Sequence, residues 1–380
     1  MSDTKVNRIL RALFFLRLAV RLGWRKATET LAYRLCSQCF LNEGLRLSAE
    51  ELGLIDNVPC PNCCSKEGRK LTRDLIELLA YRFFVWGTLH RTEYGSAPLI
   101  QFDHNHEPDI EYGPPWPQGD TRTIEKAIDV GFFHYGPRLW MVGLNIEPLD
   151  RLQDPKTRLA EVQRILQLYP DVKLRQEDTF YRLRVKPDNS SDITEYDSPG
   201  AVRGKHNRFD SDSLPIMYAS QDLQICVHEC KVTVEDEIFL ATLRPNREMK
   251  LLDLTEILPY DESSEFDSLD MAVHMLFFAG KNSYEICREI ALSAHKEGYD
   301  GLVYPSFFSL LKSGKIPFET SFGLSHRMFP QLHDRERAKI TSNLALFGHP
   351  LKQGDVEVHS INRLVLRKVQ YDFHFGPTGL

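Results

Sequence analysis

The sequence lacks any long hydrophobic run. Within its 380 residues, the apolar stretches ALFFL and LAV near the start are ended by Arg17 and Arg21. A membrane-spanning helix needs about 20 consecutive apolar residues, and a secretory signal needs an uninterrupted apolar core followed by small residues. We therefore expect neither a membrane span nor a secretory signal, and we expect a cytoplasmic protein.

A strong excess of one charge is also absent. The chain holds 47 Lys and Arg against 53 Asp and Glu, which gives a net charge of −6 and a pI near 6.1. A chain with this balance has no overall field to attract nucleic acid, so we do not expect nucleic-acid binding. Basic residues do gather at the start, where residues 4–34 also carry an apolar face and predict one or two amphipathic helices.

Internal repeats and long low-complexity tracts are missing too. Residues 101–121 are rich in Pro, Gly and His, which is typical of a loop or linker. After residue 208, short strand-like and helix-like segments alternate, which favours the α+β class. We predict a mostly helical N-terminal domain over residues 1–100, a linker and accessory segment over 101–170, and a second domain over 171–380.

Hydrophobic patterns place several elements within these domains. The apolar run LWMVGL predicts a strand at 139–144, and helical spacing predicts helices near 268–278 and 283–297. The segment DTFYRLRV alternates as a strand does, so Phe180, Arg182 and Arg184 are expected to share one face.

Five of the eight cysteines fall between positions 36 and 64, in a chain without a secretory signal. Cys36-Ser-Gln-Cys39 is followed after twenty residues by Cys60-Pro-Asn-Cys63-Cys64, and two such CxxC turns can present four thiolates to one ion. We predict a structural zinc site formed by Cys36, Cys39, Cys60 and Cys63, with no open position for catalysis. Cys64 in place of Cys60, or a set of buried free thiols, is the alternative.

The stretch DLQICVHEC at 222–230 predicts a short helix that carries a carboxylate. Leu223, Cys226, Val227 and Cys230 form its apolar stripe. Glu229 falls outside this stripe, on the flank it shares with Ile225, so we expect it beside the core rather than within it. Cys226, Cys230 and Cys287 stand at apolar helical positions and are expected to be packed thiols, not nucleophiles.

Six short segments, in the order FYR, RF, PIMYAS, HE, DGLVYPS and NLALFG, resemble the RES domain over about residues 178–365. This family is named for its arginine, glutamate and serine. It includes the toxins of toxin–antitoxin pairs that destroy NAD⁺, and its fold is similar to that of diphtheria-toxin-type ADP-ribosyltransferases. The segments LCSQCFLNEGLRLSAEELG and CPNCC resemble an N-terminal extension found on longer RES proteins.

The resemblance implies a set of site residues. Arg182 and Arg208 match the two arginines of the family, Tyr218 its tyrosine, Glu229 its glutamate and Ser306 its serine. It implies that Glu229, Arg208 and Tyr218 are catalytic and that Arg182 and Ser306 bind substrate.

Three features depart from the family pattern. Asn207 replaces the usual glycine before the second arginine, and Phe209-Asp210-Ser211 follows that arginine in place of an Asn/Pro-rich turn. The insert between Arg182 and Arg208 is also long. The loop around Arg208 is therefore where its geometry is expected to differ most.

The implied substrate is NAD⁺, and the chemistry of these residue types suits it. Guanidinium groups bind phosphate oxygens, and a fixed carboxylate stabilises the oxocarbenium-like ribose that forms when the nicotinamide–ribose bond breaks. Water as nucleophile gives an NAD⁺ glycohydrolase, and inorganic phosphate gives an NAD⁺ phosphorylase.

Two other functions remain open at this point. One is a mono-ADP-ribosyltransferase that modifies a macromolecule, and the other is a non-catalytic zinc-ribbon adaptor. The toxin-like context of the family further implies an antitoxin or another regulatory protein as a partner.

Overall fold

A computed structural model describes most of the chain. It covers residues 32–108, 110, 117–136, 139–199, 207–259, 265–309, 320–321, 324–325, 329–371 and 373–378. The chain divides into two compact units, of which unit 1 holds residues 1–90, 98–136 and 372–380, and unit 2 holds residues 91–97 and 137–371. The basic segment expected to form an amphipathic helix lies, up to residue 31, outside the described residues. Within the described ranges, every helix is too short or too polar to cross a membrane.

Unit 1 combines short helices with two small antiparallel sheets. Strand β1 (Tyr33–Cys36) pairs with β2 (Lys70–Thr72), and β5 (Ile100–His104) pairs with β6 (Val130–His134). The helical elements are α2 (Glu43–Leu52), α3 (Arg73–Ala80), α4 (Gln118–Ile128), the π-helical turn η2 (Tyr81–Val85) and the 3₁₀ turns η1 (Ser37–Cys39) and η3 (Trp86–Thr88). The hairpin of β3 (Leu89–Thr92) and β4 (Gly95–Pro98) is divided between the two units.

Local sequence explains how the first helices of unit 1 begin and pack. The Thr72 side chain accepts a hydrogen bond from the Leu75 N–H and caps α3. One face of α3 carries Leu75, Ile76 and Leu79, which are all buried in the core of the unit. The buried carboxylate of Asp120, on α4, accepts the N–H groups of Leu41 and Asn42, at 2.8 and 2.7 Å, and so fixes the chain that leads into α2.

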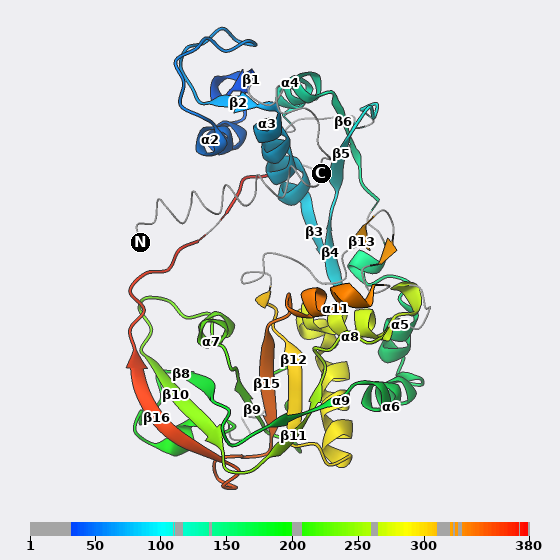
Figure 1. Cartoon of the computed structure of the whole chain (residues 1–380), viewed down its shortest axis with the longest axis vertical. Helices are drawn as coiled ribbons and strands as arrows, with labels where there is room; N and C mark the ends of the chain where they lie inside the picture. Colours follow the sequence, from blue (N-terminus) through cyan, green and yellow to red (C-terminus); the bar gives the residue numbers. More distant parts are fainter. Residues whose placement is uncertain are drawn as a thin grey trace. The chain divides into compact units, whose positions relative to one another are not determined.

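Unit 2 is built on two sheets (Figure 1). The five-stranded sheet has the order β7 (Asp171–Leu174), β11 (Met249–Asp253), β12 (Gly301–Pro305), β15 (Ser342–Phe347), β9 (Ile216–Ala219). Only its β11–β12 pair is parallel. The three-stranded antiparallel sheet has the order β16 (Val356–Leu364), β10 (Ile238–Pro245), β8 (Phe180–Val185). Strands β13 (Thr320–Ser321) and β14 (Leu324–Ser325) form a separate short pair.

The described helices of unit 2 are mostly one to four turns long. They are α5 (Glu147–Gln153), α6 (Arg158–Leu168), α7 (Leu223–Glu229), α8 (Leu269–Phe278), α9 (Tyr284–Lys296) and α11 (Pro330–Arg337). Short 3₁₀ turns are η4 (Leu139–Val142), η5 (Ile193–Tyr196), η6 (Glu265–Asp267) and η7 (Gly280–Ser283).

The five-stranded sheet is covered on both faces. Because side chains alternate along a strand, Leu302 and Tyr304 of β12 pack on one face with α6, α8 and α9, whereas Val303 packs on the other face. That second face meets the three-stranded sheet through residues such as Phe180 and Leu243. Figure 1 shows the helices and the smaller sheet on opposite sides of the five strands.

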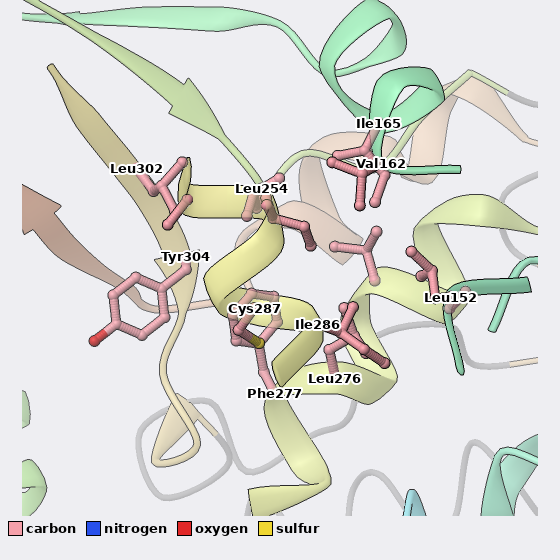
Figure 2. Packing of buried hydrophobic residues seen from close by; sticks show 14 of the residues in the cluster. Leu152, Val162, Ile165, Leu254, Leu276, Phe277, Ile286, Cys287, Leu302 and Tyr304 are labelled. Atoms are coloured by element: carbon pink, nitrogen blue, oxygen red, sulfur yellow. The ribbon is translucent and has the colours of Figure 1, made fainter. Parts of the chain in front are cut away.

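The helix-covered face holds the larger core of unit 2. Figure 2 shows Leu276 of α8 beside Ile286 of α9, and Val162 and Ile165 together on α6. The ring of Tyr304 lies at the border of this cluster, and its hydroxyl points away from the aliphatic side chains. The Tyr304 hydroxyl therefore marks the border between this hydrophobic core and the polar groups beside it.

The structure confirms the α+β class and several of the local predictions. Helices α8 and α9 begin and end within about two residues of the predicted bounds. The strand predicted at 139–144 is wrong, because residues 139–142 form a 3₁₀ turn and Gly143 follows with a φ of +74°. A short apolar run without alternation does not distinguish strand from helical turn.

Candidate functional site

Three neighbouring strands place polar side chains on the helix-covered face of the five-stranded sheet. Tyr304 on β12 pairs with Asn343 on β15, and Ala345 on β15 pairs with Tyr218 on β9. Paired residues on antiparallel strands point to the same face. Ser306 follows two residues after Tyr304 and therefore continues the same side of β12.

The carboxylate of Glu229 joins this row from α7. The side chain of Asp222 caps the helix by accepting the Gln224 and Ile225 N–H groups, and Ile225 and Cys226 are buried. Glu229 is the last residue of the helix and is exposed. As expected, it lies beside the core rather than within it.

One oxygen of this carboxylate accepts two hydrogen bonds. Glu229 Oε1 receives the Ser306 hydroxyl at 2.7 Å and the Asn343 Nδ2 group at 2.6 Å. Both donors are only 2% exposed, so they are fixed by the sheet, whereas Glu229 faces solvent. In the described part of the chain, Glu229 makes no ion pair, and its Oε2 atom accepts no hydrogen bond. Two neutral donors thus orient the carboxylate without forming an ion pair with it.

Ser306 is itself held in place. Its Oγ accepts the N–H of Phe308 at 3.1 Å, and its own N–H donates to the Thr341 carbonyl at 2.8 Å. The hydroxyl proton is therefore directed to Glu229. Ser306 acts both as a turn-capping serine and as the partner of the glutamate.

Tyr304 lies close to these groups but is buried. Burial, and then the charge of Glu229, raise the pKa of Tyr304 above its usual range, and Arg208 and Asn343 oppose the shift only in part. Its hydroxyl therefore stays protonated and can only donate or accept as a neutral group.

Arg208 is bound to backbone carbonyls at the end of α8. Its Nη1 group donates to the Leu276 carbonyl at 2.8 Å and to Ser283 Oγ at 3.2 Å, and its Nη2 group donates to the Phe277 carbonyl at 3.3 Å. The guanidinium also lies 5.3 Å from the ring centre of Tyr284. A cation at a helix C-terminus is favourable because the carbonyl ends carry partial negative charge.

The loop after Arg208, where the sequence departs from the family, is closed by Tyr218. The Tyr218 hydroxyl accepts the Phe209 N–H and donates to Asp210 Oδ1, both at 2.9 Å. Burial, and then the negative charge of Asp210, raise the pKa of Tyr218 well above its usual range. Asp210 thus supplies the acceptor that holds the Tyr218 hydroxyl against this loop.

Arg182 lies inside the core between the two sheets. Its Nη1 and Nη2 groups donate to the carbonyls of Tyr218 and Asp197, both at 2.8 Å, and the residue is 5% exposed. Burial, and then the charge of Arg184, lower the pKa of Arg182 to about 10, so the guanidinium stays protonated at neutral pH. Arg182 and Arg184 share a strand face as predicted, but Arg184 is less buried and pairs with Glu195 at 3.8 Å.

The structure therefore brings Glu229 and Ser306 into direct contact and ties Arg182 and Arg208 to backbone carbonyls. Sequence reasoning missed Asn343, Tyr304 and Asp210 as members of the site. Tyr304 and Asn343 stand within DGLVYPS and NLALFG. The alternation that puts Ser306 on one face also puts Tyr304 there.

The predicted packed thiols divide into two groups. Cys226 and Cys287 are buried, and burial raises the pKa of Cys226 to about 12, which leaves it protonated. Cys230 is exposed, so its prediction is wrong: α7 ends one residue earlier and Ile225 takes the buried position instead.

A second candidate site lies in unit 1. The sulfur atoms of Cys36, Cys39, Cys60 and Cys63 all lie within 4.8 Å of one another. The Cys36–Cys63, Cys39–Cys60 and Cys36–Cys39 sulfur pairs are 3.4, 3.6 and 3.9 Å apart. A tetrahedral ion with sulfur ligands at about 2.3 Å has sulfur–sulfur edges of about 3.8 Å. These four residues can therefore hold a metal ion, and Cys64 is an exposed neighbour outside the group.

Comparisons with known proteins bear on the segment that carries Arg182, Arg208, Tyr218, Glu229 and Ser306. Residues 179–314 match the family model described as the RES domain. A similar solved structure is the MbcT–MbcA toxin–antitoxin complex of M. tuberculosis. The match is 14% identical and covers 54% of this chain and 91% of that chain, with a TM-score of 0.33. No curated protein matches the chain.

Proposed function

The chain carries a RES domain, and from this premise we propose that it is an enzyme that cleaves the nicotinamide–ribose bond of NAD⁺. RES domains form a family that acts on NAD⁺. The proposed reaction is glycohydrolysis with water or phosphorolysis with inorganic phosphate. A toxin-like role, controlled by an antitoxin or another regulatory protein, is part of the same proposal.

The observation that carries this proposal is the environment of Glu229. A carboxylate at the last residue of a helix is opposed by the helix dipole, and within the described residues Glu229 forms no ion pair. Ser306 and Asn343 nevertheless orient it through one oxygen and leave the other without a hydrogen bond among the described residues. A fixed carboxylate of this kind stabilises a cation that develops in a ligand, as the ribose does when nicotinamide leaves.

The remaining site residues have roles that follow from their positions. We propose that Arg208 and Tyr218 border the catalytic group, because the Tyr218 hydroxyl fixes the loop that presents Arg208. Ser306 is proposed to orient Glu229 and to contact the ribose or the nicotinamide amide. The expected substrate contact of Arg182 stays a prediction, since both of its Nη groups bind carbonyls.

The cysteine group of unit 1 is proposed to hold zinc. Four thiolates suit this ion and leave no open coordination position. Bound zinc would supply structural stability to the turns that carry the ligands, Cys36–Cys39 and Cys60–Cys63, and no catalytic chemistry.

The test compares wild type with Glu229→Gln. The amide oxygen of the variant side chain can still accept from Ser306 and Asn343, so the substitution removes the charge with little change in shape. Glu235→Gln is a matched control, because Glu235 is an exposed glutamate shortly after α7. Each protein is incubated with NAD⁺, with and without phosphate, and the products are identified by mass spectrometry.

We expect wild type and Glu235→Gln to release nicotinamide, and Glu229→Gln to do so roughly 100- to 1000-fold more slowly. ADP-ribose identifies water as acceptor, and its phosphorylated form identifies phosphate. A stable label on a macromolecule would instead identify a transferase. If wild type and Glu229→Gln consume NAD⁺ equally slowly, the assigned site is wrong.

A further inference from the structure

Unit 1 contains a lysine that is completely removed from solvent. Lys70 is 0% exposed, although lysine is among the residues that are least often fully buried. Its ammonium donates to the carbonyl oxygens of Ser65, Lys66 and Glu67, at 3.1, 3.1 and 3.0 Å. All three N–H donors of the side chain are thus satisfied by three consecutive carbonyls of one loop.

The charge of Lys70 has no carboxylate partner within the described ranges. A buried ammonium without a counterion is costly, because carbonyl dipoles replace only part of its hydration. A nearby group of negative charge would therefore explain why the position is a lysine. A neutral side chain with N–H donors would suffice if the position served only to bind the carbonyls of residues 65–67.

The cysteine group supplies such a charge, and Lys70 is connected to it in two ways. The Ser65 carbonyl that accepts from Lys70 also accepts the Cys60 N–H at 2.8 Å. On the neighbouring strand, Lys70 pairs directly with Cys36 in the β1–β2 ladder. Four thiolates around a divalent ion carry two excess negative charges, and the lysine stands beside both CxxC turns.

We propose that Lys70 is a positioning residue of the metal centre. Its ammonium gathers the loop at residues 65–67 against the Cys60 turn, and its positive charge offsets part of the negative charge of the metal–thiolate group. The residue is not itself a ligand and acts through the loop and through its charge. Outer groups of this kind commonly change metal affinity by about 10- to 100-fold. This proposal does not depend on the reaction proposed for the RES domain.

The test uses full-length protein purified with zinc, with Lys70→Met and, as a matched control, Lys66→Met. Lys66 is an exposed lysine of the same loop, so its removal changes the net charge equally without emptying a buried site. Zinc content is measured by elemental analysis, and zinc release to a coloured chelator is followed over time. Circular dichroism of the zinc-loaded proteins checks that each variant is folded.

We expect Lys70→Met to release zinc at least about tenfold faster than wild type, and Lys66→Met to release it at the wild-type rate. Should Lys70→Met fail to fold, Lys70→Gln removes the charge but keeps two N–H donors on a side chain one bond shorter, and faster release from it supports the same conclusion. Equal rates for all variants, or equal acceleration by both methionine variants, would overturn the proposal. Wild-type protein that retains no zinc would overturn it too.

Discussion

Replacing Arg182 with methionine tests whether this arginine holds the fold or binds substrate. The change removes two charged hydrogen bonds, to the carbonyls of Tyr218 and Asp197, each with a value of about 1.5–3 kcal/mol. It also removes a buried charge whose pKa has fallen to about 10, which at about 1.4 kcal/mol per unit corresponds to roughly 3 kcal/mol of relief. The bonds outweigh the relief, so we expect a net loss of about 2 kcal/mol in the free energy of unfolding.

The measurement is equilibrium unfolding in urea, together with hydrogen exchange of peptides that cover β8 and β9. Arg184→Met is the matched control: Arg184 lies on the same strand face, and its side chain is 33% exposed in a 3.8 Å pair with Glu195. We expect this control to change stability by less than about 1 kcal/mol. If Arg182→Met unfolds like wild type but raises the KM for NAD⁺, Arg182 contacts substrate, and the positioning role argued from its hydrogen bonds is wrong.

Three further predictions concern ionisation. Asn343→Asp places a second carboxyl group beside Glu229, and because like charges raise one pKa, the acid limb of the pH–rate profile should move upward; an unchanged profile would separate Asn343 from the catalytic group. Burial opposes ionisation of Asp300, but hydrogen bonds from Arg247 lower its pKa. This contribution to stability is therefore present above about pH 4 and is lost as the pH falls through the lowered pKa. Asp300→Asn should then reduce stability by about 1 kcal/mol at pH 7 and make little difference in urea unfolding near pH 2. The pKa of Tyr304 is raised in the folded protein, so its contribution to stability is fully present below about pH 10, where the unfolded tyrosine begins to ionise, and decreases above that pH. The free energy of unfolding of Tyr304→Phe should therefore decrease less steeply than that of wild type between about pH 10 and 11 in urea unfolding.

Local patterns predict much of unit 2 because the hydrophobic period of a helix or a strand is visible within a short segment of sequence. The alternation along residues 180–184 places Phe180 in the core between the sheets and turns Arg182 to the same side. The apolar spacing over α8 and α9 predicts both helices almost to their observed ends. The prediction of a strand at 139–144 is wrong because that run is uniformly apolar and shows neither the helical nor the strand period on which the correct predictions depend.

The contacts of the site depend on strand pairing, which sequence does not specify. Glu229 meets Ser306 and Asn343 across 77 and 114 residues. Ser306 could be named because it resembles a family position. Asn343 could not be assigned a role, because its place beside Tyr304 follows from the β12–β15 register. The same holds for Arg182, whose burial is set by the packing of one sheet on the other.

The geometry of the site bears most directly on one end of the proposed substrate, NAD⁺. Arg182 and Arg208 both donate to backbone carbonyls, so the guanidinium groups that were expected to bind pyrophosphate are already engaged. The carboxylate of Glu229, by contrast, has an oxygen without a hydrogen bond among the described residues and is oriented by two buried donors. A group arranged in this way stabilises positive charge at a fixed point. The nicotinamide–ribose end is where NAD⁺ develops such a charge, and Glu229→Gln is therefore a sharper test of the proposed chemistry than a substitution of either arginine.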